Sequence, residues 1–453
     1  MQIMKWNNLL LPFVATMAYA QNQKPNVIVI LVDDMGIGDN GSYGGHITPT
    51  PNIDRLASEG LQLGSFYSAA PVSSPARAGL ITGRCPIKYG MNTFLDTRAA
   101  NKRVENADFL DPQAPTMAHA FQNAGYATGH FGKWHMGGGR DVQDAPGFEN
   151  YGFDEHVSTY ESPDPDPKLT STNWIWAASD EVKRWNRTSY FIDRALEFMQ
   201  RQKEANKPFF LNLWPDDVHT PWVPEAMAEK RGQWETRDSF EPVMIELDRQ
   251  LGRFFDAIDE MGLRDNTIVI YTADNGPAPS FKQERTLGKR GQKNSLYEGG
   301  INMPFIIRYP KAIKAGRVNN KTVLSTLDLY PSLCSMCGIP VQEGYTGDGA
   351  DYSKAFLGKS QPKRKETLMW DFGRNRFYNR PANDYHKSPH LAIRKGRWKL
   401  LCNDGMTDAE LYDLSADPKE TRNVADLHPD IVKKLSAQVC EWYETYRLGM
   451  VTK

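Results

Sequence analysis

Two continuous apolar runs constrain the fold of this chain more than any other feature. Residues 26–32 read Asn-Val-Ile-Val-Ile-Leu-Val, and a second run of this kind covers residues 267–272. Strands without apolar–polar alternation are typical of parallel sheets that helices cover on both faces. The polar residues that end the two runs are Asp33, Asp34, Asp274 and Asn275. Because ligands of open α/β sheets bind beyond the carboxyl ends of strands, we expect these residues at one edge of the sheet.

Helical patterns separate the predicted strands. Amphipathic patterns cover residues 190–205 and 240–261, and a further apolar strand pattern lies between them at 208–214. Shorter helical patterns lie at 52–59, 77–82 and 116–123. Strands that alternate with helices predict an α/β protein with a large, mainly parallel β-sheet flanked by helices.

The pattern changes after about residue 350. Short strand-like pieces at 367–372 and 390–401 precede a final amphipathic helix at 429–446. This order predicts a smaller α+β subdomain that contains a short antiparallel sheet. We therefore expect an N-terminal domain over residues 21–360 and a C-terminal subdomain over residues 361–453.

The first residues have the pattern of a secretory signal. Lys5 precedes an apolar run that ends in Ala18-Tyr19-Ala20, a small-x-small cleavage pattern. We therefore expect a signal peptide over residues 1–20 and export to the bacterial periplasm or secretion. The apolar run is shorter than the roughly 18 residues of a membrane span, so no stable membrane insertion is expected.

Charge and cysteine content exclude several classes of protein. Lys and Arg number 54 against 55 for Asp and Glu, so no broad basic surface for nucleic acid is expected. Five cysteines in 453 residues do not make a disulfide scaffold, although export would permit Cys402 to pair with Cys440. Cys334 and Cys337 have metal-site spacing without a second pair, which favours buried apolar positions.

The acidic strand ends offer only hard oxygen atoms. Such atoms suit calcium or magnesium far better than a soft metal. One Asp-Asp pair after a strand is more often a helix cap or a solvated turn, but two clusters after two buried strands favour a metal site. A divalent ion there could polarise a sulfate or phosphate oxygen and keep a neighbouring nucleophile reactive.

The segment Ser73-Ser74-Pro75-Ala76-Arg77, followed by Thr82-Gly83-Arg84, places a small nucleophile near a cation. Read alone, it is an ordinary entry into a helix, with Pro75 in the first turn and Ser73 or Ser74 as the cap. Its combination with the acidic strand ends favours a catalytic role instead.

Four further polar residues lie in distinctive contexts. Lys133 and His135 stand two apart in a glycine-flanked strand or loop, His219 follows a predicted strand in a proline-bounded loop, and Lys293 precedes a segment that ends in Gly-Gly. Each is also compatible with a solvated surface position. Together they supply two cations and two proton carriers.

From residue 26 to about residue 424, the chain resembles the type I sulfatases of the alkaline phosphatase superfamily. The specific part is Ser73-x-Pro75-x-Arg77 with Leu80-x-Thr82-Gly83-Arg84, the signature in which a Cys or Ser is oxidised to formylglycine. This chain has the serine version, which in the family requires an anaerobic-type maturation enzyme. One departure is Asn302, at a position where similar sequences often carry Arg after the Gly-Gly; we interpret that position as support for the loop.

The resemblance implies a role for each residue. Asp33, Asp34, Asp274, Asn275 and the matured residue 73 would bind a calcium ion, which would also contact a sulfate oxygen. The formylglycine hydrate at residue 73 would attack sulfur with Arg77 stabilising it, while Lys133 and Lys293 would neutralise the sulfate oxygens. His219 would protonate the leaving alcohol, and His135 would deprotonate the hydrate to expel sulfate.

The resemblance implies a sulfated saccharide as substrate, and we favour an exo-acting sulfatase of glycosaminoglycan or mucin-type glycan fragments. Two alternatives remain open from the sequence. One is a phosphodiesterase or phosphonate monoester hydrolase of the same superfamily, and the other is a non-catalytic glycan-binding member. The donor-rich loop 374–380, with His386 and His390, is our candidate for substrate specificity, and a solvated basic loop is the alternative.

Overall fold

The computed structural model describes residues 24–169 and 176–451. The predicted signal peptide over residues 1–20 lies outside this part of the chain. No helix within the described ranges combines the length and the apolar character that crossing a membrane requires.

One large sheet organises the N-terminal part. Its strands are β1 Asn26–Val32, β2 Leu61–Tyr67, β3 Ala127–Gly132, β4 Glu155–Ser158, β5 Phe209–Trp214, β6 Thr267–Ala273, β7 Asn302–Arg308, β8 Arg317–Asn319 and β9 Leu324–Ser325. The order in the sheet is β4-β3-β5-β1-β6-β7-β2-β8, with β9 paired to β2. β4, β3, β5, β1 and β6 run parallel, whereas β7 is antiparallel to both β6 and β2. The prediction of a mainly parallel sheet is therefore confirmed.

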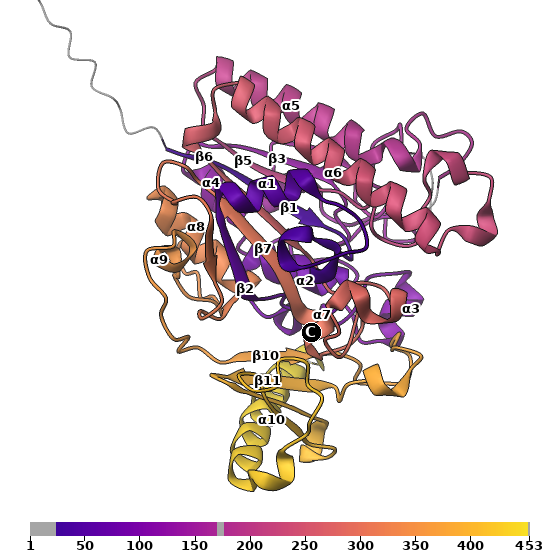
Figure 1. The fold of residues 1–453 in the computed structure, drawn as a ribbon, viewed down its shortest axis with the longest axis vertical. Coiled ribbons are helices and arrows are strands. Elements are labelled where there is room, and N and C mark those ends of the chain that lie inside the picture. The colour runs from indigo at the N-terminus through magenta and orange to yellow at the C-terminus, as the bar shows by residue number, and fades with distance from the viewer. Residues whose placement is uncertain (1–23, 170–175, 452–453) are drawn as a thin grey trace, which may run out of the picture.

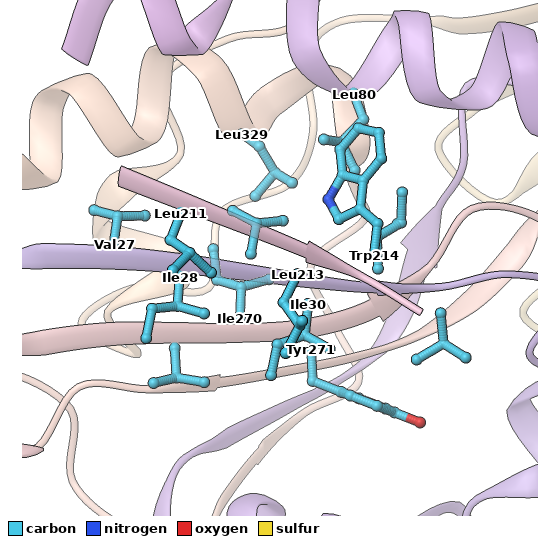
Figure 2. Close-up of a cluster of buried hydrophobic side chains, with 14 of the residues drawn as sticks. Val27, Ile28, Ile30, Leu80, Leu211, Leu213, Trp214, Ile270, Tyr271 and Leu329 are labelled. Carbon is cyan, nitrogen blue, oxygen red and sulfur yellow. The ribbon is translucent and has the colours of Figure 1, made fainter. Parts of the chain in front are cut away.

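The central strands are buried on both faces. Every residue of β1, β5 and β6 is buried, as the unbroken apolar runs predict. Figure 2 shows apolar side chains of these three strands packed together, with Leu80 and Leu329 from helices that lie against the sheet. This core holds the strand ends in fixed positions.

Helices cover the sheet (Figure 1). They are α1 Pro51–Glu59, α2 Ser73–Thr82, α3 Arg98–Arg103, α4 Met117–Asn123, α5 Arg187–Glu204, α6 Arg237–Glu260, α7 Glu298–Ile301, α8 Leu329–Cys337 and α9 Ser353–Phe356. α1 and α5 each pack against α6, and α2, α4 and α8 pack together. The helices predicted at 52–59, 116–123, 190–205 and 240–261 are confirmed within a few residues, whereas α2 begins four residues before the predicted start.

A second, antiparallel sheet lies in the C-terminal part, below the large sheet in Figure 1. Its strands are β10 Leu368–Asp371, β11 Leu391–Lys395, β12 Trp398–Cys402 and β13 Glu410–Asp413, in that order, and helix α10 Pro429–Val451 packs on β11 and β12. The smaller α+β unit with a short antiparallel sheet is thus confirmed. The domain boundary at residues 360–361 stays a prediction.

A buried group of charges joins the two sheets. Lys399 of β12 lies between Glu298 of α7 and Glu420, with Nζ at 3.0 Å and 2.9 Å from their carboxylates. Tyr67 of β2 donates to the second oxygen of Glu298 at 2.7 Å and also contacts Arg394 of β11. We call these five residues the junction cluster.

The five cysteines are free thiols in the structure. Burial, together with the neighbouring Cys440, raises the pKa of the Cys402 thiol to about 12. Cys334 and Cys337 lie buried in α8, as the sequence predicts.

Candidate active site

The parallel strands bring their carboxyl ends to one edge of the sheet. β1, β3 and β6 are followed there by Asp33, Lys133 and Asp274, and β5 leads into the loop that carries His219. These residues are far apart in the sequence. Their meeting point is the edge at which open α/β sheets bind ligands.

Three carboxylates converge at this edge. Asp33, Asp34 and Asp274 are buried, and each offers an oxygen within 4.8 Å of the others. Asn275 is buried beside them and donates from Nδ2 to Asp34 Oδ1 at 2.7 Å. Burial raises the pKa of Asp274 to about 7, with the charge of Asp33 acting in the same direction. Buried hard oxygens that face one another form a donor set that fits a divalent cation such as calcium.

Ser73 lies beside these carboxylates at the first residue of α2. Its Oγ is 3.0 Å from Asp33 Oδ1 and 3.4 Å from Asn275 Oδ1, and the side chain is buried. Ser74 Oγ instead accepts the backbone N–H of Leu95 at 3.0 Å. Neither serine caps the helix, because the cap position is Val72 and no side chain caps it. The segment is therefore a helix entry with Pro75 in its first turn, as the sequence predicts, but the prediction that Ser73 or Ser74 caps it is wrong.

Arg77 lies one turn into the same helix and is fully buried. Its guanidinium donates to Asp274 Oδ2 at 2.8 Å and to the backbone carbonyl of Lys133 at 2.9 Å, and it lies 3.4 Å from Asp33. The indole of Trp214 packs at 5.1 Å from the guanidinium carbon. These contacts fix the cation one helical turn from the Ser73 hydroxyl.

Lys133 follows the end of β3 in a loop rather than in a strand. Its Nζ donates to Asp33 Oδ2 at 2.7 Å and to Ser73 Oγ at 3.3 Å. Burial acts to raise the pKa of Asp33, but the cations Lys133, Arg77 and Lys293 and the nearby His219 hold that pKa well below its usual range. Asp33 is thus a carboxylate within reach of both a cation and a hydroxyl.

Lys293 and His219 form a second pair at the site. Lys293 Nζ donates to Asp34 Oδ2 at 2.7 Å and to His219 Nε2 at 2.9 Å. His219 Nδ1 lies 2.6 Å from the carbonyl of Thr220, which places the proton of the neutral ring on Nδ1. Burial and the charge of Lys293 lower the pKa of His219 to about 4. Nε2 of the neutral ring therefore accepts a hydrogen bond from the Lys293 ammonium.

His135 lies in the same loop as Lys133, with its backbone in the left-handed region. Its Nε2 is 3.1 Å from the carbonyl of Leu95 and 3.3 Å from Glu161 Oε1. These acceptors place the proton of the neutral ring on Nε2 and make Nδ1 the basic nitrogen. Burial and the charges of Lys133 and Arg140 hold the pKa of His135 well below its usual range.

Comparisons with known proteins identify the family to which a chain with this site belongs. The family model described as "Sulfatase" matches residues 25–339, and the model described as "N-sulphoglucosamine sulphohydrolase, C-terminal" matches residues 290–445. The chain belongs to the sulfatase family. It is a type I sulfatase of the alkaline phosphatase superfamily, and its reaction is the hydrolysis of sulfuric esters.

Individual relatives match nearly the whole chain. An N-acetylgalactosamine-6-O-sulfatase of Bacteroides thetaiotaomicron is 31% identical over 92% of this chain and 92% of its own length. Arylsulfatase A of Homo sapiens is 29% identical, covering 94% of this chain and 89% of its own. A structure solved in work on the metabolism of multiple glycosaminoglycans by Bacteroides thetaiotaomicron has a TM-score of 0.75 and 28% identity, over 94% of this chain and 99% of its own.

Two buried residues of this sulfatase site have no signal in the sequence. Glu161 follows β4, and its carboxylate contacts His135, Arg140 at 3.0 Å and Tyr160 at 3.1 Å. Arg184 lies before α5 and donates to the carbonyl of His219 at 3.0 Å, so it holds the loop that carries this histidine. A position just after a strand could have indicated Glu161, but β4 has only four residues and its pattern is too short to recognise.

Two residues of the candidate specificity set in this sulfatase make buried contacts within the fold. Arg374 is buried in contact with Asp371 and donates to Asn92 at 2.9 Å. His390 is buried, with its ring 5.4 Å from that of Tyr443. Of the basic and imidazole groups in this candidate set, His386 is the one that lines a cavity next to the site.

Asn302 occupies the position where the sequence departs from the family pattern. Its side chain accepts from Lys289 and donates to the backbone carbonyl of Phe66 at 3.3 Å. The residue therefore ties the loop before α7 to β2. This contact pattern supports our interpretation of the position as structural.

Proposed function

We propose that the protein is an exported carbohydrate sulfatase that removes sulfate from the ends of sulfated glycan fragments. The observation that carries the proposal is the position of Ser73, whose Oγ lies 3.0 Å from Asp33 and 3.3 Å from Lys133 in a buried site of converging carboxylates. The names of the relatives support a sugar substrate, since one is an N-acetylgalactosamine-6-O-sulfatase.

The residues present fit the two groups that this chemistry needs. Asp33, Asp34, Asp274 and Asn275, together with residue 73, would hold Ca²⁺. Ser73 would be converted to formylglycine by a serine-type, anaerobic maturation enzyme. When in place, these groups supply a polarised sulfate oxygen and a strong oxygen nucleophile.

Cations of the chain would then bind and orient the sulfate. Lys133 and Lys293 lie on either side of the carboxylates, so their ammonium groups can approach the sulfate oxygens on which charge gathers. Arg77 holds Asp274 and the backbone of Lys133 in place. These groups are fixed by buried contacts before substrate arrives, which is the condition for efficient electrostatic stabilisation.

Two histidines would move the protons. A sugar alcohol is a poor leaving group unless it is protonated. His219 Nε2, which lies 2.9 Å from the Lys293 ammonium, would carry that proton to the leaving oxygen. His135 Nδ1 is the candidate base for the second half of the reaction, with Glu161 holding the opposite side of the ring.

Export and maturation are linked in this proposal. The pattern of residues 1–20 supports passage to the periplasm or beyond, where sulfated glycans from outside the cell would be met. The maturation enzyme would act on Ser73 before this passage is complete.

The test is sulfate release from a panel of sulfated mono- and disaccharides. The protein is produced with a serine-type maturation enzyme, and its mass must show formylglycine at residue 73. Release from sugar sulfates supports the proposal, and the position that reacts identifies the substrate. Faster release of phosphate from phosphodiesters would instead favour the phosphodiesterase alternative. Sugar binding without any turnover by the fully matured protein would favour the glycan-binding alternative.

A further inference from the structure

A cavity of about 300 Å³ opens beside the site, and the proposed reaction uses none of the side chains that line it. Its walls are residues 277–283, Arg285 and Thr286, the pair Gly291 and Gln292, and three residues of the C-terminal part, Ala382, Asn383 and His386. The volume is at the lower end of the range for small-molecule sites.

The cavity adjoins the leaving-group side of the site. Gln292 precedes Lys293, and the backbone N–H of Lys293 donates to the carbonyl of Pro277 at 2.9 Å. Lys293 in turn contacts His219, the proposed proton donor to the sugar alcohol. A saccharide that presents its sulfate to the carboxylates and its bridging oxygen to His219 therefore extends toward this cavity.

The cavity wall is held in an unusual backbone conformation. Phe281, Lys282 and Gln283 all have φ between 47° and 69°, the left-handed region that residues other than glycine seldom adopt. The ring of Phe281 anchors the turn, 5.6 Å from Trp222 and 5.3 Å from Phe240. Strain of this kind persists where surrounding packing holds it, and it gathers at ligand sites. Here it presents two polar side chains to the cavity.

The first of these side chains is Gln283, which contacts His386. The backbone N–H of Gly291 donates to His386 Nδ1 at 3.0 Å, so the proton of the neutral ring lies on Nε2. The amide nitrogen of Gln283 is placed 2.7 Å from His386 Nε2. Because two donors cannot share a hydrogen bond, we assign the amide the opposite orientation, with its oxygen accepting from the ring N–H. Its NH₂ group is then available as a hydrogen-bond donor to a ligand in the cavity.

The second side chain is Lys282, which is exposed. Among the described residues it has no ion-pair partner, whereas the guanidinium of Arg285 in the same wall is bound by Asp39 at 2.7 Å. The residues that line the cavity include no aspartate and no glutamate. The cavity therefore combines an available cation and an amide donor with no competing carboxylate.

We propose that this cavity binds a second oxyanion of the sulfated saccharide, a carboxylate or another sulfate, through Lys282 and the NH₂ group of Gln283. The inference rests on the proposed function and deepens it, because it specifies a substrate that carries two negative groups. His386 is a positioning residue that orients Gln283.

Paired saccharides test the charge preference. The acidic member is N-acetylgalactosamine 6-sulfate joined to glucuronic acid, and the neutral member is the same disaccharide with its carboxyl group reduced to an alcohol. A third probe, N-acetylgalactosamine 4,6-disulfate, carries the second anion as a sulfate on the same ring, and its reference is the 6-sulfate alone. Binding of each to the Ser73→Ala protein is measured by calorimetry, and kcat/KM is measured on the matured enzyme.

We expect one acidic probe to bind at least 10-fold more tightly than its neutral reference, with a matching ratio in kcat/KM. Lys282→Gln should bring that ratio close to one, and Gln283→Ala should lower it several-fold. The matched controls are Lys359→Gln and Gln361→Ala, exposed residues outside the cavity walls. The probe that shows the preference identifies whether the second anion is a carboxylate or a sulfate.

Two results would overturn the inference. The first is an acidic-to-neutral ratio near one for every probe in the protein without cavity substitutions. The second is a ratio that stays high in both Lys282→Gln and Gln283→Ala. Failure of the proposed function looks different, because the matured enzyme would then release no sulfate from any probe. In that case the binding ratios in the Ser73→Ala protein still decide whether the cavity selects an anion.

Discussion

The active site and the junction cluster are both buried groups of charged side chains, yet they are built in opposite ways. At the junction, Lys399 lies between Glu298 and Glu420, so a cation separates the two carboxylates. At the active site the carboxylates of Asp33, Asp34 and Asp274 face one another within 4.8 Å. The cations there approach from the periphery instead.

The difference shows how buried charges that receive a ligand can be told from buried charges that only stabilise the fold. Burial of charge is common to both regions and is compatible with a purely structural role. Convergence of like charges is unfavourable unless a ligand fills the space between them. Of the two arrangements, only the active site is therefore organised to receive a cation, and a nucleophile lies beside it. Five substitutions test the contrast, and they are given from the largest expected effect to the smallest.

Ser73→Ala should abolish turnover and leave the fold intact. Removal of the nucleophile should lower sulfate release by at least about 10³-fold, because no other hydroxyl replaces Oγ. The melting temperature should stay within about 2 °C of the parent protein, since a small group is lost from a polar site. Ser58→Ala, at an exposed serine, is the control. Residual turnover above that limit would show that residue 73 is not the nucleophile.

His219→Ala should separate two kinds of substrate. Loss of a general acid costs roughly 10²–10⁴-fold when the leaving group needs a proton. A sugar sulfate needs that proton, whereas an aryl sulfate with an acidic phenol needs it much less. We therefore expect a loss at least 10-fold larger on the sugar sulfate, measured as kcat/KM, with exposed His46→Ala as control. Equal losses on both substrates would remove the acid assignment.

Asp274→Ala should weaken calcium binding. The substitution removes one of the converging carboxylates, and we expect the Kd for Ca²⁺ to rise at least 10-fold. Calorimetry on protein treated with a chelator measures this directly, and the stabilisation that added Ca²⁺ gives to the melting temperature should shrink in parallel. Exposed Asp265→Ala is the control. Unchanged affinity would mean that the ligand set is wrong.

Lys399→Met should destabilise the protein and leave the catalytic chemistry alone. The substitution leaves two buried carboxylates without a cation, which should lower the free energy of unfolding by roughly 3–5 kcal/mol. Urea unfolding measures the loss, and Lys395→Met on the exposed side of β11 is the control. Activity per folded molecule should be retained. A stable variant with impaired turnover would contradict the structural role of the junction.

Glu420→Gln should alter the pH dependence of stability. Burial raises the pKa of Glu420 to about 7; Lys399 opposes this rise and Glu298 adds to it. A carboxyl group with a pKa near 4.3 in the unfolded chain then takes up a proton on folding, so its contribution to stability falls as pH rises from about 4.3 to about 7.

The parent protein should therefore lose melting temperature between pH 5.5 and 7.5 by about 1–3 °C more than Glu420→Gln does. Exposed Glu235→Gln should behave like the parent protein. The same slope in parent protein and Glu420→Gln would show that Glu420 titrates normally in the folded state.

The sequence predicts one of these two regions far better than the other. Asp33 and Asp274 follow unbroken apolar strands, and Ser73 and Arg77 lie one turn apart in a short motif, so these local patterns, taken together with the family resemblance, indicate them. Their convergence follows from the rule that parallel strands end at one edge.

The rest depends on contacts between distant segments. Glu161 and Arg184 act on His135 and His219 through tertiary packing, and neither belongs to a recognisable motif. Lys399 lies on β12 in a pattern typical of any amphipathic strand, so nothing local distinguishes it from a solvated lysine. For the same reason, no local pattern shows that Arg374 of the donor-rich loop 374–380 contacts Asp371 and Asn92, and the role of that loop in specificity stays a prediction.

The burial of Ser73 sets an order of events in the cell. The residue is 1% exposed at the base of α2, beneath the loops that complete the site. Under the proposed function, a maturation enzyme could not reach Ser73 once the chain has folded, so oxidation and folding would compete for the same newly made polypeptide. The proportion of active molecules would then depend on the rate of oxidation relative to the rate of folding. Faster expression should produce a well-folded population that later exposure to the maturation enzyme cannot rescue.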